Sequence, residues 1–289
     1  MLRSPLTFRG HYAARIAVLV ACLAGLAFAT QTPLAEGKFA KRVELGGKNL
    51  EALKPNCGRD FSRQCVVEGK MTGFQALSTK SPGRNFVVPY TGKLVSWAIS
   101  LADVTRRDIE VDGVTQPAQL PAFGLFFGTT TSQARISILR QVEVRKKGAP
   151  RFKLVRQGPL VTLNPYFGST VRFTLDTPLN VYKDNVVALT TPTWVPALWK
   201  PRVCDVLEFG IRDPEACEQA GKTFTWRASR MPQGKDECVI SVDRETLEPN
   251  ETLAKSRPQQ TVDSVKRYGC YYGANALLYS ATIVAPAGN

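Results

Sequence analysis

The chain has 289 residues and carries 38 Lys and Arg against 24 Asp and Glu, which gives a formal net charge of +14. This balance favours contact with polyanions such as wall polymers, acidic lipid or nucleic acid, although a basic surface that only aids solubility has the same composition. The single histidine is His11, and neither a P-loop nor a G-x-G-x-x-G run occurs. If a leader containing His11 is removed, the remaining chain has no imidazole, which excludes Ser-His-Asp and Cys-His catalysis and H-E-x-x-H zinc sites. The missing loops exclude the nucleotide binding that a P-loop or a G-x-G-x-x-G turn provides.

Residues 1–29 have the order of a secretory signal peptide. A basic stretch comes first, an apolar stretch spans residues 16–28, and Ala27-Phe28-Ala29 fits the A-x-A cleavage rule. The apolar run is shorter than the roughly 20 residues of a membrane-spanning helix, so we expect a secreted protein without a transmembrane span. The three arginines of the signal leave with it, so 35 of the 38 Lys and Arg remain against 24 Asp and Glu, a net charge of +11.

Attachment to lipid is the alternative to release. Leu19-Val20-Ala21-Cys22 has the spacing of a bacterial lipobox, in which Cys22 would carry the lipid and begin the mature chain. The apolar stretch continues past Cys22, whereas a lipidated cysteine normally ends such a stretch. We therefore expect a secreted protein first and a protein anchored at Cys22 second.

Residues 30–55 are expected to form a flexible N-terminus, and residues 56–286 a single domain. Apolar and polar residues alternate within that domain, as in strands with one buried face, at residues 95–101, 136–144, 171–175 and 277–283, and further apolar runs occupy residues 186–190 and 224–226. Signals typical of turns separate these segments. The pattern predicts an all-β fold, an antiparallel β-sandwich of jelly-roll-like form.

Three long stretches lack a regular strand pattern and are expected to be loops, where binding sites are often found. They cover residues 103–124, 192–213 and 243–264. The second and third contain or adjoin cysteines, so the predicted sandwich has long disulfide-bearing loops.

Six cysteines remain beyond the signal: Cys57, Cys65, Cys204, Cys217, Cys238 and Cys270. An even number in an exported chain indicates disulfide bonds, although six cysteines allow many connectivities. The first expectation pairs neighbours along the chain, Cys57 with Cys65, Cys204 with Cys217 and Cys238 with Cys270. Their role would then be structural.

Positive charge is densest around Gly148 and Pro150, the expected tip of a β-hairpin. The cluster consists of Arg145, Lys146, Lys147, Arg151, Lys153 and Arg156. It is a candidate site for a polyanion, because many lysines and arginines lie within one short segment. The alternative is that these charges keep the hairpin soluble and its edges unpaired.

Two tryptophans, Trp194 and Trp199, bracket a short proline-containing segment. An exposed indole can stack on a sugar ring, so both residues are candidate ligand contacts. Buried indoles dominate the energetics of cores, so packing or loop anchoring is the favoured interpretation of both residues.

Paired carboxylates are the remaining catalytic chemistry, because a glycosidase can work with two acids and no histidine. The candidate pairs flank the C-terminal cysteines, and solvated surface acids explain them better than a catalytic pair does. They are Asp205 with Glu208, Asp213 with Glu215, and Asp236 with Glu237.

A calcium loop is a further alternative, since Asp108, Glu110 and Asp112 precede Gly113. The twelfth position holds Gln119 where a bidentate glutamate would be needed. The segment fits an exposed strand entering a turn better, so no metal and no cofactor is expected.

Five further segments are distinctive, and they include Ser96-Trp97, Thr193-Trp194 and Gly269-Cys270: residues 86–97, 179–189, 193–197, 225–230 and 268–279. In these segments the chain resembles a group of uncharacterised exported actinobacterial proteins. The resemblance covers most of the chain beyond the signal. Because no activity, ligand or functional residue is assigned to the group, it implies a β-sandwich and nothing more.

Export, disulfides, the basic hairpin and the missing imidazole together predict a non-catalytic extracellular or cell-surface module, either binding or structural. Its partner would be an anionic or carbohydrate surface polymer, since no specific nucleic-acid motif occurs. The alternative is a carbohydrate-active hydrolase that uses paired carboxylates.

Overall fold

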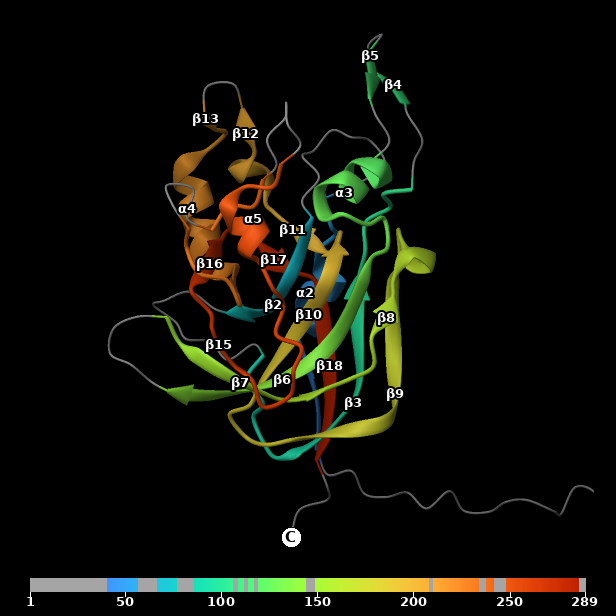
Figure 1. Ribbon diagram of the computed structural model, residues 1–289. Helices are drawn as coiled ribbons and strands as arrows, with labels where there is room; N and C mark the ends of the chain where they lie inside the picture. Colours follow the sequence, from blue (N-terminus) through green and yellow to red (C-terminus); the bar gives the residue numbers. More distant parts are fainter. Residues whose placement is uncertain are drawn as a thin grey trace, which may run out of the picture. The chain divides into compact units, whose positions relative to one another are not determined.

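Two antiparallel β-sheets pack against each other in the computed structural model of the chain (Figure 1). Residues 40–289 form one compact unit. No helix in the described part is long and apolar enough to cross a membrane. The predicted signal peptide and Cys22 lie outside the described residues, which are 41–56, 67–76, 86–105, 109–111, 114–116, 119–143, 149–207, 210–233, 238–241 and 248–285.

The smaller sheet has four strands in the order β1, β18, β3, β9. They span Lys41–Leu45, Tyr279–Ala285, Gly92–Ser100 and Thr170–Val181, respectively. Both β3 and β18 follow the predicted alternation, since Trp97, Ile99, Ala281 and Ile283 all belong to the main core.

The larger sheet has a central group of four strands in the order β7, β6, β10, β2. These strands span Arg151–Gln157, Gln133–Glu143, Val186–Val195 and Glu68–Ala76. Three strands continue the sheet beyond its central group and one pairs separately with β6: β15 (Val265–Arg267) next to β7, β14 (Thr225–Ala228) and β16 (Cys270–Gly273) beyond β2, and β8 (Val161–Thr162) on β6.

The order of the eight main strands identifies the topology. In chain order they are β1, β2, β3, β6, β7, β9, β10 and β18. One sheet holds the first, eighth, third and sixth of them, and the other holds the second, seventh, fourth and fifth. This is the jelly-roll arrangement, in which two Greek keys are wound into a double sheet. The predicted antiparallel sandwich and its jelly-roll form are confirmed.

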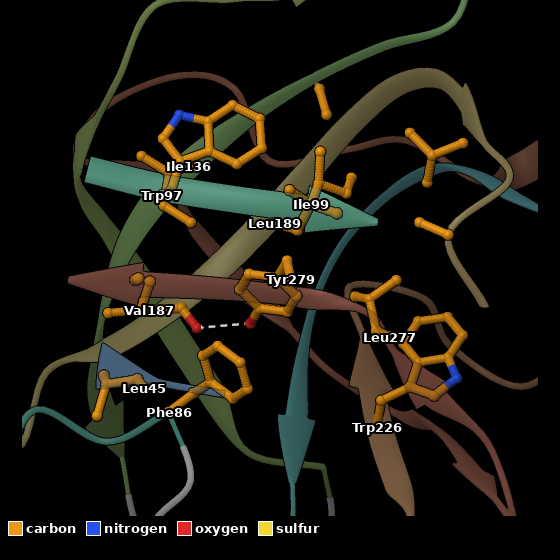
Figure 2. Packing of buried hydrophobic residues seen from close by; sticks show 14 of the residues in the cluster. Leu45, Phe86, Trp97, Ile99, Ile136, Val187, Leu189, Trp226, Leu277 and Tyr279 are labelled. Atoms are coloured by element: carbon orange, nitrogen blue, oxygen red, sulfur yellow. Dashed lines mark hydrogen bonds between the residues drawn. The ribbon is translucent and has the colours of Figure 1, made fainter. Parts of the chain in front are cut away.

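Aromatic and aliphatic side chains from both sheets fill the space between them (Figure 2). Phe86 stacks on Tyr279 with ring centroids 4.2 Å apart. The Tyr279 hydroxyl donates a hydrogen bond of 2.9 Å to the Val187 carbonyl, so its polar end is satisfied inside the core. Trp97 packs on Phe173 at 4.7 Å. Burial of each large apolar side chain contributes roughly 1.5–3 kcal/mol to the free energy of folding.

A long insertion separates β10 from β18 and carries both described disulfides. It supplies β14, β15 and β16 to the larger sheet, and Cys204 is joined to Cys217 and Cys238 to Cys270. These two bonds confirm two of the predicted neighbour pairs, whereas Cys57 and Cys65 lie outside the described residues. The other elements of the insertion are β11 (Leu198–Trp199), η2 (Arg202–Cys204), β12 (Val206–Leu207), β13 (Gly210–Ile211), α4 (Pro214–Thr223), α5 (Glu251–Lys255) and β17 (Ala276–Leu277).

Gln259 fastens this insertion to the larger sheet. Its backbone N–H donates to the Thr72 hydroxyl at 2.9 Å, and its side-chain amide donates to the Phe152 carbonyl at 3.1 Å. The Tyr268 hydroxyl donates to the Gln259 side-chain carbonyl at 2.8 Å. Because all four residues are buried, each of these polar groups needs its partner. The network fixes the position of the chain that follows α5.

The N-terminal boundary differs from the expected one. Residues 41–45 form β1, which pairs with β18 from Lys41 opposite Ala285 to Leu45 opposite Ala281, and α2 (Gly47–Ala52) follows. A strand and a short helix thus occupy residues 41–52, within the segment expected to be a flexible N-terminus. Val43 and Leu45 face the core, but a strand of five residues with three charges shows little alternation.

The expected loops also contain short elements. Residues 103–124 include the hairpin of β4 (Ile109–Val111) and β5 (Val114–Gln116) and the start of α3 (Gln119–Phe127). The hairpin fits the strand-and-turn alternative to the calcium loop. Residues 192–195 complete β10, and α5 lies within residues 243–264. A further short helix, η1, spans Asn164–Tyr166.

Candidate anion-binding site

Trp194 lies in the protein interior and is fully buried. Its indole N–H donates to the Thr129 carbonyl at 2.9 Å, and Phe123 and Phe127 lie against its ring. A buried ring offers no face to a sugar, so the structure corrects the ligand-contact prediction in favour of packing. Trp199 is partly buried and meets Phe224 edge-on at 4.8 Å. The structure does not bring Trp194 and Trp199 together as a stacking platform.

The predicted basic hairpin is the β6–β7 pair. Arg151 and Lys153 lie on β7, and Lys153 forms an ion pair of 2.7 Å with Asp263. Arg145, Lys146 and Lys147 fall outside the described residues, so binding at the tip of the hairpin stays a prediction.

Two of the candidate acids, Asp213 and Glu215, have a structural role at the start of α4. Asp205 directly follows η2, and its backbone N–H donates to the Arg202 carbonyl at 3.0 Å. The Asp213 carboxylate accepts a hydrogen bond from the Ala216 backbone N–H at 3.0 Å and caps α4, whose first turn also contains Glu215. Acids at a helix N-terminus stabilise the helix, because they accept hydrogen bonds from its free N–H groups and face the positive end of its dipole. Glu208, Asp236 and Glu237 lie outside the described part. Within that part, no cluster of three or more His, Cys, Asp or Glu is arranged to hold a metal.

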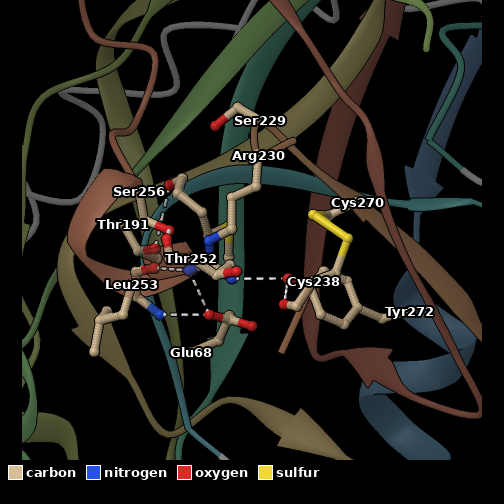
Figure 3. Close-up of polar contacts among 12 residues, drawn as sticks. Glu68, Thr191, Ser229, Arg230, Cys238, Thr252, Leu253, Ser256, Cys270 and Tyr272 are labelled. Carbon is tan, nitrogen blue, oxygen red and sulfur yellow. Dashed lines mark hydrogen bonds and ion pairs between the residues drawn. A yellow bond between two sulfur atoms is a disulfide. The ribbon is translucent and has the colours of Figure 1, made fainter. Parts of the chain in front are cut away.

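The most unusual polar group of the described chain is the buried ion pair of Arg230 and Glu68 (Figure 3). Their side chains are 1% and 5% exposed, and an Arg230 terminal nitrogen lies 2.7 Å from a Glu68 carboxylate oxygen. The same nitrogen donates to the Gly69 carbonyl, and the other terminal nitrogen donates to the Tyr272 hydroxyl at 2.9 Å. A buried charge persists only when it is paired and hydrogen-bonded in this way.

The backbone around Arg230 is held as firmly as its side chain. The Arg230 carbonyl accepts hydrogen bonds from the N–H groups of Gly269 at 2.7 Å and Cys270 at 3.0 Å. The Tyr272 hydroxyl donates to the Cys238 carbonyl at 2.8 Å, so both halves of the Cys238–Cys270 disulfide adjoin the site. The geometry is therefore fixed before any ligand arrives.

Arg230 lies at the wall of a pocket of about 240 Å³. Four cations line this pocket, together with three hydroxyl side chains, and no carboxylate of the described residues does. We call it the insertion pocket, since all its residues belong to the insertion. Its lining residues are Ser229, Arg230, Met231, Gln233, Thr252, Lys255, Ser256, Lys266 and Arg267.

Several hydrogen-bond donors of the insertion pocket are committed to the protein. The Ser256 hydroxyl donates to the Thr252 carbonyl at 2.6 Å, Lys266 donates to the Arg257 carbonyl at 2.6 Å, and Lys255 pairs with Glu251. The Arg230 Nε–H, by contrast, is buried and has no acceptor among the described residues. An ammonium group has three N–H bonds, so Lys266 keeps donors for a ligand beside its one bond to Arg257.

Like charges crowd the insertion pocket. Burial lowers the pKa of Lys266, and the nearby Arg257 guanidinium lowers it further. The pKa of Lys70 is lowered by the same two causes, burial first and Arg257 second. Burial alone would lower the pKa of Arg230, but Glu68 and Tyr272 raise it overall. Arg230 therefore stays charged, and an added anion would relieve the repulsion among the other cations.

Sequence reasoning missed this site. Arg230 and Gly69 are 161 positions apart, and no local pattern indicates that an arginine at the end of a short strand is buried. Trp226 and Arg230 lie close together in one short segment, but their proximity in the sequence does not indicate a binding site.

Comparison with protein families, curated proteins and solved structures finds no match to this chain. The site must therefore be interpreted from its own chemistry.

Proposed function

We propose that this protein is a secreted, non-catalytic binding module that recognises an anionic group of an extracellular polymer in the insertion pocket. The observation that carries the proposal is the lining of this pocket, which has four cations and no carboxylate of the described residues. Phosphate, sulfate and carboxylate groups are the acceptors that arginine and lysine select.

The charge balance near the insertion pocket supports an anion over a neutral ligand. Lys255, Lys266, Arg267 and Arg230 line it. Only Glu68 and Glu251 form described salt bridges with lining residues, and Arg257 adds a further nearby cation. The described groups thus leave an excess of positive charge. Such an excess raises the local concentration of anions and their rate of association.

An extracellular setting fits the covalent structure. Disulfides persist in oxidising compartments, and the described insertion has two. Export itself rests on the signal-peptide prediction, and membership of the exported actinobacterial group stays a prediction as well.

The hydrolase alternative gains no support from the described acids. Asp213 caps a helix, and Glu68, the one buried carboxylate among the described side chains, is bound to Arg230. A paired Glu68 lacks the free position that a general acid needs next to a substrate. We therefore favour binding over catalysis.

The test uses inorganic phosphate as the probe, with chloride at equal ionic strength as the reference. Phosphate is expected to bind saturably and to raise the Tm, because a ligand at 100 times its Kd stabilises the folded state by about 2.7 kcal/mol. Titration calorimetry and thermal unfolding give the two measurements.

Matched variants locate the binding. The double variant Lys266→Gln/Arg267→Gln should weaken phosphate binding by tenfold or more, since charged hydrogen bonds contribute about 1.5–3 kcal/mol. Lys93→Gln is the control, because Lys93 is exposed on β3 of the other sheet. Equal affinity in the double variant and the control would refute the proposal.

A further inference from the structure

An exposed tyrosine stands beside a second hollow, outside the insertion. Tyr182 follows β9 directly and is 52% exposed. Its ring lies under the Arg156 guanidinium, 5.9 Å from the ring centroid. Both residues line a hollow of about 360 Å³, and its other charged lining residues are Arg140, Lys183 and Asp184. It shares no lining residue with the insertion pocket.

The turn that carries Tyr182 is fixed by hydrogen bonds. The Asn185 N–H donates to the Tyr182 carbonyl at 3.0 Å, and the Tyr182 N–H donates to the Asn185 side-chain oxygen at 3.1 Å. The Asp184 N–H donates to the Val88 carbonyl at 2.9 Å, and Asp184 has a left-handed φ of 67°. Tyr182 is thus presented outward by a rigid turn, which lowers the entropic cost of binding to its ring.

Positive charge surrounds the exposed ring. Arg140 lies on β6, Arg156 on β7 and Lys183 on the turn. Asp184 lines the hollow too, so three cations face one carboxylate among the described lining residues. An aromatic face accepts an apolar surface, while guanidinium and ammonium groups accept anionic oxygen.

We infer that this hollow is a binding site for one residue of an acidic sugar. The C–H face of the sugar ring would stack on the open part of the Tyr182 ring, and its carboxylate or sulfate would lie between Arg156, Arg140 and Lys183. A simple anion would use the cations without the ring, and a neutral sugar would use the ring without the cations. The inference deepens the proposed polymer binding but rests on a different set of residues.

Three probes of different chemistry separate these possibilities. Trigalacturonate has rings and charge, maltotriose has rings without charge, and tripolyphosphate has charge without rings. Trigalacturonate is expected to bind most tightly by titration calorimetry. If maltotriose bound equally well, charge would play no part in recognition. If tripolyphosphate bound equally well, the hollow would only attract anions, and the ring of Tyr182 would play no part. Either result would overturn the inference.

Variants of Tyr182 test the stacking directly. Tyr182→Ala should weaken trigalacturonate binding about five- to tenfold, whereas Tyr182→Phe keeps the ring and should bind like the wild type. Arg156→Gln should weaken trigalacturonate and leave maltotriose unchanged. Unchanged affinity in Tyr182→Ala would contradict the stacking.

All titrations are repeated in the Lys266→Gln/Arg267→Gln background. Loss of phosphate binding with trigalacturonate binding retained at Tyr182 would establish two separate sites. Retained phosphate binding in this background would refute the proposed insertion pocket alone. Loss of the Tyr182-dependent trigalacturonate binding would refute the second site.

Discussion

At the scale of single residues, Arg230 determines what the insertion can do. Its guanidinium is held by Glu68, Tyr272 and the Gly69 carbonyl, and its Nε–H lacks a described acceptor. A buried ion pair of this kind contributes little net stability, because desolvation of the two charges opposes their attraction. In the proposed function, anion recognition gives the pair a role beyond stability.

Replacing one partner of the Arg230–Glu68 ion pair should lower the stability of the protein strongly, whereas replacing both partners should not. Arg230→Met leaves Glu68 buried without a partner and is expected to lower the free energy of unfolding by about 3–5 kcal/mol. Combining Arg230→Met with Glu68→Leu should recover most of that loss. Urea denaturation measures all three proteins, and a double variant no more stable than Arg230→Met would contradict this interpretation.

Glu44 links folding stability to pH. Burial would raise the pKa of Glu44, but hydrogen bonds from Arg172 and Ser280, together with the charges of Arg172 and Arg42, bring it below its ordinary value of 4.5. The folded state thus favours the ionised form. Its contribution to stability is complete above about pH 4.5 and is lost as the pH falls through the lowered pKa.

Glu44→Gln is therefore expected to lose stability at neutral pH and to show a flatter dependence of unfolding free energy on pH below 4.5. Urea denaturation between pH 3 and pH 7 measures the difference from wild type. Asp176→Asn on β9 is the control, because Asp176 is exposed. Parallel curves for wild type and Glu44→Gln would show that the contact with Arg172 does not form.

At the scale of elements, the two disulfides should differ in their effect on the site. In the chain-entropy model, a sequence separation of 32 residues gives Cys238–Cys270 about 4 kcal/mol of stabilisation, and a separation of 13 gives Cys204–Cys217 about 3 kcal/mol. Cys238 and Cys270 also contact Tyr272 and Arg230 through their backbones.

Cys238→Ser/Cys270→Ser should therefore weaken phosphate binding as well as stability, while Cys204→Ser/Cys217→Ser should lower stability with little change in phosphate affinity. Thermal unfolding and calorimetry of both variants provide the comparison. Equal losses of affinity in the two variants would mean that the disulfide near Arg230 does not hold the pocket.

The elements that the sequence predicted share one property, which is a local pattern. Trp97 and Ile99 on β3, or Ala281 and Ile283 on β18, alternate with smaller or polar residues because the inner face of each strand is buried. The neighbour pairing of cysteines also succeeded for two bonds, since short loops bring such cysteines together.

The central strand β2 could not be predicted in this way. It contains Gly69 and Gly73 and is buried on both faces, so no alternation is visible. A Cβ at Gly69 would lie 2.1 Å from the Thr193 carbonyl oxygen, and one at Gly73 would lie 3.0 Å from the Trp226 ring. Both glycines are required by neighbours distant in the sequence, and the same holds for the partners of Arg230.

At the scale of the whole molecule, the jelly roll is a scaffold and the insertion between its last two strands carries the site. The scaffold buries one main core between its sheets, and the insertion is fastened to it by β14, β15 and Gln259. The cations of the insertion pocket therefore lie on the insertion and not in the main core between the sheets. The formal net charge, +14 for the full chain and +11 without the predicted signal peptide, supports steering of anionic partners toward the surface.

Binding of an anionic polymer should weaken as the salt concentration rises. Retention on immobilised heparin is expected to fall steeply as salt rises, because several lysines and arginines would displace counterions together. Lys266→Gln/Arg267→Gln should elute at lower salt than Lys93→Gln. Retention that ignores ionic strength, or equal elution of the two variants, would argue against polyanion binding through the insertion pocket.

The location of a bound anion tests the proposed site most directly. Crystals soaked in selenate, a heavy analogue of sulfate and phosphate, give an anomalous signal that marks the position of the ion. The insertion pocket should hold a peak within hydrogen-bonding distance of Lys266 Nζ and the Arg267 guanidinium, and this peak should be lost in Lys266→Gln/Arg267→Gln. Selenate bound elsewhere on the protein, with an empty insertion pocket, would contradict the proposed function.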